Sequence, residues 1–168
     1  QHSTSMSDRN GSIECSLVAD KLSKDLIKFG RYASGKFIPE HVKYEENLIK
    51  QNILLGFLDS DGCVYKDKRG YVSLEFVSMN LRLLEDLQDI AFSLGLVGNL
   101  SKLREEGEYN IEGRIGKQNR AYHLRFGHTD SIKFANMCNF DNRSKLSKID
   151  KESIKQIRNR PKSGCFLS

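Results

Sequence analysis

Hydrophobic and polar residues follow two different periods along this chain, and these periods predict helices and strands. Apolar residues recur every three to four positions in residues 16–29, 45–59 and 81–94, which is typical of helices that bury one face or more. Apolar residues occupy every second position in residues 71–78 and 120–126, which predicts strands with one buried face.

The alternation also assigns the side chains of these two strands to opposite faces. The residues predicted to face the core are Val72, Leu74, Phe76, Tyr122, Leu124 and Phe126, and those predicted on the other face are Tyr71, Ser73, Glu75, Val77, Ala121, His123 and Arg125. A strand of this kind belongs to a sheet that is covered on one side only.

The remaining segments complete a repeating order of helix, strand and strand. Residues 63–66 and 97–104 are predicted to pair with the two strands above, the first through a turn at 67–70. A further helix is expected from residue 129 or 130 to about 139, and the polar stretch 105–119 has room for a short strand. The predicted fold is therefore α+β, with the order αββαββα and an antiparallel sheet that carries helices on one face.

The chain divides into three parts by composition. Residues 1–44 are expected to hold a polar leader, a helix and an irregular linker, and residues 45–140 the main domain. Residues 141–168 form a basic tail, in which residues 150–159 suggest a short amphipathic helix. We interpret residues 1–12 of the first part as the leader, because they are polar and rich in serine.

Charge is unevenly distributed over the 168 residues. The net charge is +5, and residues 141–168, with eight basic and three acidic side chains, account for all of it. A basic end on a neutral body is typical of a protein that binds a polyanion, although a solvated basic tail has the same composition. No apolar run approaches the roughly 18 residues of a membrane span and no secretory signal is visible, so we expect no membrane partner.

The four cysteines Cys15, Cys63, Cys138 and Cys165 are widely spaced. Structural zinc sites usually take their ligands in close pairs, so a zinc site is not expected. Scattered cysteines suit an intracellular, reducing compartment. We expect Cys63 and Cys138 to pack in the core.

The segment 54–62, LLGFLDSDG, carries the clearest chemical signal. An apolar helix ends there in Asp59 and Asp61, which oppose the negative end of the helix dipole and should need a cationic group nearby. Gly56, inside the helix, costs about 1 kcal/mol relative to alanine and suggests that another backbone approaches it closely. The four residues DSDG alone are also compatible with an ordinary tight turn.

These nine residues resemble the signature of the LAGLIDADG homing endonucleases. The positions identical to that signature are Leu54, Gly56, Asp59, Asp61 and Gly62. The segment KFIPEHV at residues 36–42 resembles the linker between two repeats of intein-type members, and residues 16–30 resemble the final helix of a preceding repeat. Only one full motif is present, so the resemblance implies either a homodimer or a partner that supplies a separate first repeat.

The resemblance implies roles for the motif residues. Asp61 would hold a divalent cation, Mg²⁺ or Mn²⁺, the carbonyl of Ser60 would add a ligand, and Asp59 would support the helix end within the catalytic set. The residues expected at an interface between two motif helices are Leu54, Gly56 and Phe57. A basic residue would lie near the cleaved phosphate, for which the candidates are His128, just after the last strand, and Lys133.

The free face of the sheet would then lie over the major groove of double-stranded DNA. The residues expected to contact DNA are Lys66, Lys68, Arg69, Tyr71, Ser73, Lys102, Arg104, Arg114, Lys117, Arg120, His123, Arg125 and Lys145. Glu75 lies on the same face and would repel phosphate unless it pairs with a base such as Arg125 or accepts from a cytosine amine.

Two classes of function follow from this reading. The first is a metal-dependent, site-specific endonuclease that hydrolyses phosphodiester bonds of double-stranded DNA. The alternative is a non-catalytic binder of nucleic acid on the same fold, such as an RNA-splicing maturase or a transcription regulator. The presence of both Asp59 and Asp61 favours the enzyme, because a pure binder gains little from two anions that face phosphate.

Overall fold

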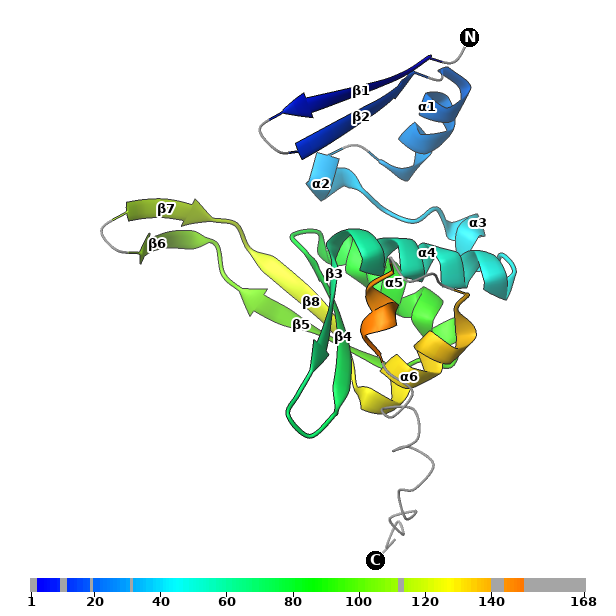
Figure 1. Ribbon diagram of the computed structural model, residues 1–168, viewed down its shortest axis with the longest axis vertical. Coiled ribbons are helices and arrows are strands. Elements are labelled where there is room, and N and C mark those ends of the chain that lie inside the picture. Colours follow the sequence, from blue (N-terminus) through cyan, green and yellow to red (C-terminus); the bar gives the residue numbers. More distant parts are fainter. Residues whose placement is uncertain are drawn as a thin grey trace, which may run out of the picture.

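A four-stranded antiparallel sheet carries helices on one face and leaves the other face free (Figure 1). The computed structural model describes residues 3–9, 12–18, 20–30, 32–111, 114–139 and 144–149. The helix expected at 150–159 lies outside these residues. Within the described residues, no helix has both the length and the apolar character that a membrane crossing requires.

The elements of the main domain follow the expected αββαββα order, which confirms the α+β prediction. They are α4 (Asn47–Asp61), β3 (Gly62–Lys66), β4 (Val72–Ser78), α5 (Leu81–Ser93), β5 (Gly98–Arg104), β8 (Ala121–Phe126) and α6 (His128–Met137). The strands lie in the order β3-β4-β8-β5, and every neighbouring pair is antiparallel. Both α4 and α6 contact β4, and α5 contacts β4, β5 and β8.

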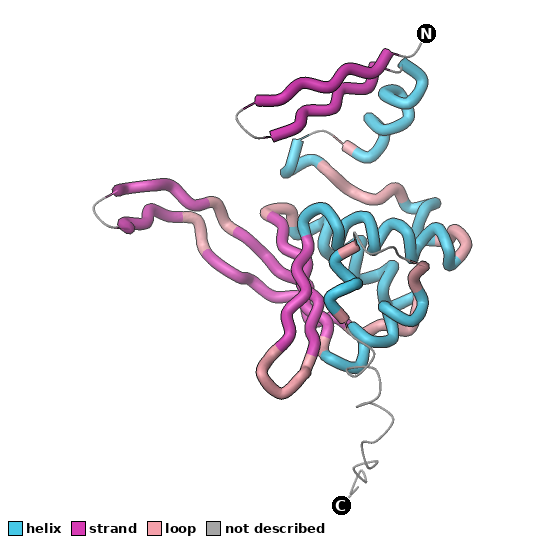
Figure 2. The backbone as a smooth tube through the Cα atoms, in the orientation of Figure 1, coloured by secondary structure: helices cyan, strands magenta, loops and turns pink. Residues whose placement is uncertain are grey.

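A second, smaller hairpin lies in the connection between β5 and β8, which pair directly with each other in the main sheet. It consists of β6 (Gly107–Ile111) and β7 (Arg114–Gln118), where the sequence suggested a polar connection with room for one short strand. Tyr109 lies against Gly116, where a β-carbon would come within 2.5 Å of the tyrosine ring. Figures 1 and 2 show this hairpin extending away from the body of the protein, in line with β5 and β8.

The N-terminal part differs from the prediction. β1 (Ser3–Arg9) and β2 (Ser12–Val18) form an antiparallel hairpin, so the expected leader is a strand and the helix does not begin at residue 16. Helix α1 (Asp20–Leu26) continues into the short helix η1 (Ile27–Phe29). The alternation of apolar and polar residues in SIECSL, at positions 12–17, is the strand signal that the helical interpretation passed over.

The linker between α1 and α4 is more ordered than expected. It contains the four-residue helices α2 (Tyr32–Gly35) and α3 (Glu40–Lys43). The side chain of Asn80 accepts a hydrogen bond from the backbone N–H of Leu83 at 3.2 Å, so Asn80 caps the start of α5. The same side chain donates to the carbonyl of Lys36 and so ties the linker to the start of α5.

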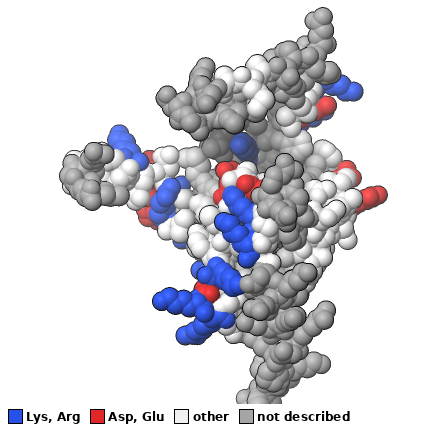
Figure 3. Space-filling view, viewed as in Figure 1, with Lys and Arg blue, Asp and Glu red and all other residues white. Residues whose placement is uncertain are grey.

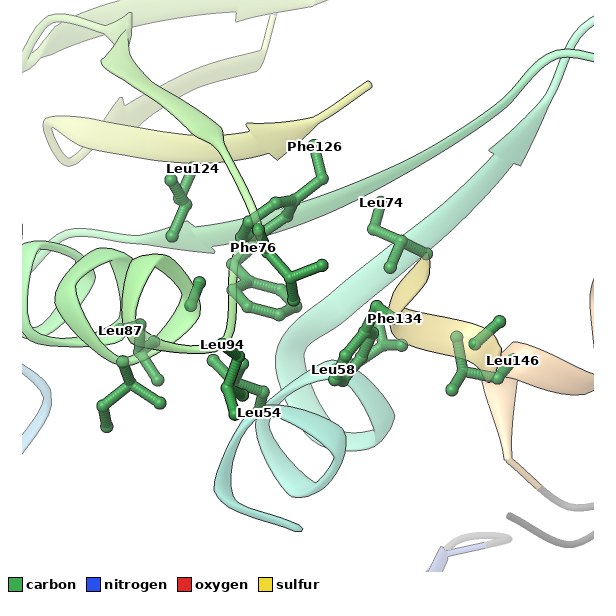
Figure 4. Close-up of a cluster of buried hydrophobic side chains, with 14 of the residues drawn as sticks. Leu54, Leu58, Leu74, Phe76, Leu87, Leu94, Leu124, Phe126, Phe134 and Leu146 are labelled. Carbon is green, nitrogen blue, oxygen red and sulfur yellow. The ribbon is translucent and has the colours of Figure 1, made fainter. Parts of the chain in front are cut away.

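The core lies between the sheet and the helices (Figure 4). The predicted inner face of β4 is confirmed, because Val72, Leu74 and Phe76 are each 1% exposed. The ring of Phe76 lies at the centre and meets Phe57 of α4 and Phe126 of β8 edge-on, with ring centroids 5.3 and 5.5 Å apart.

Strand β8 departs from the predicted faces at its first residue. Leu124 and Phe126 are buried and Arg125 is exposed, as expected, but Ala121 is also buried, contrary to its assignment to the open face. The pairing of β5 with β8 shifts register between Lys102 and Arg104, opposite this end of β8. An irregularity of this kind turns the strand locally, so the strict alternation no longer holds there.

A buried carboxylate attaches the linker to α5. Asp86 of α5 accepts a hydrogen bond from the backbone N–H of Ile38 at 2.9 Å, and its other oxygen lies 2.7 Å from Nζ of Lys43. Lys43 also contacts Asp89 at 3.0 Å. The hydrogen bond to Asp86 and the further contact with Asp89 raise the pKa of Lys43 above its ordinary value, so the lysine stays charged.

We expect the substitution Asp86→Ala to lower the free energy of unfolding by about 2–3 kcal/mol, because it leaves the buried N–H of Ile38 without an acceptor. The control is Asp89→Ala, which removes a 64%-exposed partner of the same lysine and should cost no more than about 0.5 kcal/mol. Chemical unfolding of both variants measures the difference. Equal losses would show that the buried carboxylate has no special role.

Candidate functional site

The junction between α4 and β3 brings the motif residues together. Asp61 is the last residue of α4, and Gly62 follows as the first residue of β3. A β-carbon at Gly62 would lie 2.7 Å from Cα of Leu58 and 2.9 Å from its carbonyl oxygen. Glycine is therefore required by close packing, because its φ of −88° is open to any residue. The strand can leave the helix at this sharp angle only without a side chain.

Asp59 is engaged by a segment that follows the main domain. Its Oδ1 accepts hydrogen bonds from Oγ of Ser144 at 2.9 Å and from the backbone N–H of Lys145 at 2.8 Å. These residues begin the short helix η2 (Lys145–Lys148), which is anchored in the core by the fully buried Leu146. Asp59 thus holds the last described segment against the end of α4.

Lys145 supplies the cationic group expected at the helix end. Its Nζ donates to the carbonyl of Ser60 at 3.1 Å and to the carbonyl of Gly62 at 2.7 Å, on either side of Asp61. A lysine at the C-terminus of a helix stabilises the partial negative charge there. The ammonium has three protons, so one remains for a further acceptor. The carbonyl of Ser60, which was expected to bind a metal, is already an acceptor for this lysine.

Asp61 differs from Asp59 in its surroundings. It is exposed, and its carboxylate makes no hydrogen bond or ion pair with the residues that the structure describes. Within the same described ranges, no three His, Cys, Asp or Glu side chains converge into a metal cluster. Asp59 is exposed as well, but its Oδ1 is engaged, so Asp61 is the motif carboxylate at which an oxygen-seeking cation such as Mg²⁺ would find a hard ligand without competing hydrogen bonds from the described residues.

The two cysteines near the junction have different environments. Cys138 is half-buried beside the core, and burial, together with the charge of Asp59, raises the pKa of its thiol to about 12. Cys63 of β3 is exposed, so the prediction that it packs in the core is wrong. The first strand residue after the glycine faces outward because the alternation places Val64, its neighbour, toward the core.

The face of α4 that carries Gly56 is open to solvent. Nothing lies within 4 Å of the place that a β-carbon of Gly56 would occupy. Ile53, Gly56 and Phe57 line a hollow of about 570 Å³ that extends to Asp61 on one side and to Phe29 and the linker on the other. Leu54, expected on this face, is instead 1% exposed in the core of the same chain. The close approach predicted for Gly56 is not made within the described chain and stays a prediction.

His128 is not brought to the junction, and Lys133 has its ion pair on its own helix. His128 is the first residue of α6, where its Nδ1 accepts from the backbone N–H of Val72 at 3.0 Å and its ring contacts the ring of Tyr71. Val72 pairs with the end of β3 four residues beyond Gly62, which places it roughly 13 Å along the strand. Lys133 pairs with Asp130 on α6.

The open face of the sheet carries a hydrogen-bonded row. Glu75 of β4 contacts Nδ1 of His123 on β8, and Nε2 of His123 lies 2.7 Å from Oγ of Ser101 on β5. The suggested pairing of Glu75 with Arg125 is therefore replaced by one with histidine. Arg125 instead donates to Oγ of Ser73 at 3.4 Å.

The β3–β4 hairpin forms a second hollow on this face, of about 410 Å³. Its lining includes Tyr65, Lys66, Tyr71, Ser73 and Arg125. The turn at the tip is held by Oδ1 of the aspartate at position 67, which accepts from two backbone N–H groups beyond it. The turn residues Lys68 and Arg69 project from this tip and are exposed.

The remaining basic candidates lie toward the β6–β7 hairpin. Lys102 pairs with Glu105, and Nε of Arg104 donates to the carbonyl of Asn119 at 3.1 Å. Lys117 and Arg120 are exposed, and the structure places Arg114 at the start of β7. Figure 3 shows Lys and Arg side chains spread along the strands on one face, from this hairpin to the β3–β4 tip.

Two site residues escaped the sequence analysis. Ser144 anchors Asp59, and Ser101 completes the row on the sheet. Ser101 could have been placed on the open face, because it directly follows the apolar Leu100 in a predicted strand and neighbouring side chains point to opposite faces. Ser144 gave no comparable signal, since its role depends on a contact 85 residues away along the chain.

Comparison with known families agrees with this geometry. A model of the LAGLIDADG-like domain matches residues 49–159, which include most of the motif helix, the whole four-stranded sheet and η2. A search of curated proteins finds no match. Because the family match covers about two thirds of the chain and the motif forms the junction described above, the chain belongs to the LAGLIDADG homing endonuclease family.

Proposed function

We propose that the protein is a metal-dependent, site-specific endonuclease of double-stranded DNA. The observation that carries this proposal is the contrast between the two motif carboxylates. Asp59 is occupied by two hydrogen bonds that hold η2, whereas Asp61 is exposed at the end of α4 with no partner among the described residues. An exposed carboxylate beside a lysine ammonium suits a site that binds a cation and a phosphate together.

Asp61 would hold Mg²⁺ or Mn²⁺ through its carboxylate oxygens. When bound, such an ion would neutralise charge on the phosphate and make a water more acidic. The carbonyl of Ser60 can add a ligand only if it shares or gives up its hydrogen bond from Lys145. Other oxygen ligands would come from the DNA phosphate and from a second motif.

Lys145 would contact the phosphate at the cut site. Its ammonium is fixed by the two carbonyls that flank Asp61, and its third proton is available to a phosphate oxygen. A positive charge that is already fixed stabilises the negative charge that develops during cleavage without reorganising. This role was considered for His128 and Lys133 from the sequence, and their positions favour Lys145 instead.

The open sheet face would bind the DNA. Basic side chains on it can contact phosphates, and polar ones such as Ser73 can reach base edges in the major groove. The β6–β7 hairpin would lengthen this surface, because a two-stranded ribbon fits the major groove. The apolar inner face of the same sheet is closed by the helices, so only one side is available.

A second motif helix would cover the open face of α4. Leu48 and Ile49 of α4 are 61% and 42% exposed, and Leu26 near the same hollow is 56% exposed. Exposed apolar groups in this density mark an interaction surface. The partner would be a second copy or a separate first-repeat half. The strand–strand–helix order of β1, β2 and α1 repeats the order of β5, β8 and α6, which supports descent from a two-repeat protein.

A nucleic-acid binder without nuclease activity is the alternative. RNA would be its ligand if the chain were a splicing maturase, and the same sheet face would serve. The exposed Asp61 favours the nuclease, because an unneutralised carboxylate at this point would weaken phosphate binding.

We expect Asp61→Asn to lower DNA cleavage in Mg²⁺ about 100-fold or more while DNA binding is kept, because the amide is a poor cation ligand. Cleavage of a plasmid library measures the first and a mobility shift the second. The control is Asp89→Asn, an exposed aspartate on α5. If wild-type protein cuts no target but binds RNA tightly, the nuclease proposal fails.

We expect Lys145→Met to slow cleavage at least about tenfold and to lower the free energy of unfolding by about 1 kcal/mol, because the helix end loses its cation. Lys148→Met is the matched control, since Lys148 lies on the same short helix and is exposed. Single-turnover cleavage and chemical unfolding report the two effects. A stability loss without a fall in rate would limit Lys145 to a structural role.

We expect Gly56→Ala to stabilise the isolated chain by up to about 1 kcal/mol, because a methyl group meets open space there and alanine favours helix. In the assembly the methyl group would clash with the second helix and weaken association about tenfold or more. Sedimentation at micromolar concentration measures association. Gly107→Ala, also in open space, is the control. Cleavage by a strictly monomeric wild type would contradict the partner proposal.

A further inference from the structure

Three side chains from three neighbouring strands form a connected row across the open face of the sheet. His123 lies between Glu75, which contacts its Nδ1, and Ser101, whose Oγ is 2.7 Å from its Nε2. Ser101 is directly opposite His123 in the pairing of β5 with β8, whereas Glu75 reaches it diagonally from β4. The row begins at Glu75, which lies opposite Cys63 of β3, and runs from there across β8 to β5.

The inner and outer parts of the row differ in exposure. The side chains of Glu75 and His123 are 12% and 18% exposed, whereas Ser101 is exposed. A carboxylate can only accept hydrogen bonds, so Nδ1 of His123 must carry the proton between these two groups. The histidine is therefore held in one tautomer, and the serine hydroxyl is the end that faces a ligand.

The proton on Nε2 then determines what Ser101 offers. When His123 is neutral, its Nε2 accepts the hydroxyl proton of Ser101, so the serine oxygen presents lone pairs to a ligand. When His123 is protonated, Nε2 donates to the serine oxygen, and the hydroxyl proton points outward. A hydroxyl that accepts suits the amines of adenine and cytosine, and one that donates suits guanine and the O4 of thymine.

We propose that Glu75, His123 and Ser101 read one base pair of the bound DNA as a unit, and that protonation of His123 changes which bases the unit prefers. This inference rests on the proposed binding of DNA to the sheet. Ser101 contacts the base edge, His123 sets the direction of its hydroxyl, and Glu75 is a positioning residue for the imidazole. The carboxylate of Glu75 thereby acts through histidine rather than on the DNA.

The other titratable or charged groups around the row come from β3 and from β8. From β3, Cys63 lies opposite Glu75 and Tyr65 is nearby, and the contacts with Cys63 and Glu75 raise the pKa of the Tyr65 hydroxyl, so it stays neutral. From β8 itself, Arg125 is permanently charged and is turned toward Ser73. Histidine is the side chain that ordinarily changes charge between about pH 5 and 8.

The test is a binding selection from randomised DNA duplexes at about pH 6 and pH 8, with the base preference read at each position. At one position the wild-type preference for adenine or cytosine over guanine or thymine should be about two- to tenfold greater at the higher pH. Ser101→Ala should remove the shift there and leave other positions unchanged. Glu75→Gln should weaken the shift, because the imidazole loses its fixed tautomer.

The matched control is Thr129→Ala, which removes an exposed hydroxyl from α6, on the other side of the sheet. It should keep the wild-type shift. A shift that persists in Ser101→Ala, or wild-type preferences that are the same at both pH values, would overturn the inference while DNA binding stands. Wild-type protein that retains no DNA at either pH would overturn the proposed function itself, and this inference with it.

Discussion

The end of helix α4 is the point on which the rest of the structure depends. A helix that ends in two carboxylates is electrostatically unfavourable. Here the groups that compensate for it come from a segment far along the chain. Asp59 accepts hydrogen bonds from the side chain of Ser144 and the backbone N–H of Lys145, at the start of η2. In turn, the ammonium of Lys145 donates to the carbonyls on either side of Asp61. This exchange offsets the charge, docks the last described segment and leaves the carboxylate of Asp61 without a hydrogen bond to the described residues.

The two faces of the sheet have different chemistry, and packing against the helices is confined to one of them. The inner face of β4 and β8 is aromatic and aliphatic and holds α4 in place through Phe76. The outer face satisfies its own polar groups in cross-strand pairs, such as the row centred on His123. A face that has already paired its acid with a histidine presents less negative charge to a phosphate backbone than its composition suggests.

Much of the fold could be predicted because its signals are local. The cap at Asn80, the alternation in β4 and the Gly-ending motif helix each occur within a few neighbouring residues. The sequence did not reveal which side chains from distant segments pair with each other. Glu75 had two bases within reach on β8, and it contacts the diagonal His123 although the strand register places Arg125 directly opposite it. The N-terminal hairpin was missed for a different reason, because a strand of seven residues is short enough to resemble the start of a helix.

The hydrogen bond between Asp59 and Lys145 also affects the order in which the elements can assemble during synthesis. The two residues are 86 positions apart, so a chain emerging from the ribosome completes α4, β3 and β4 long before η2 can reach them. Until then the helix end has neither its cation nor its anchor. The candidate site is therefore assembled last, and a growing or truncated chain that lacks η2 carries the sheet without the fixed charge beside Asp61. Recognition of nucleic acid and the capacity to act on it would mature in that order during synthesis.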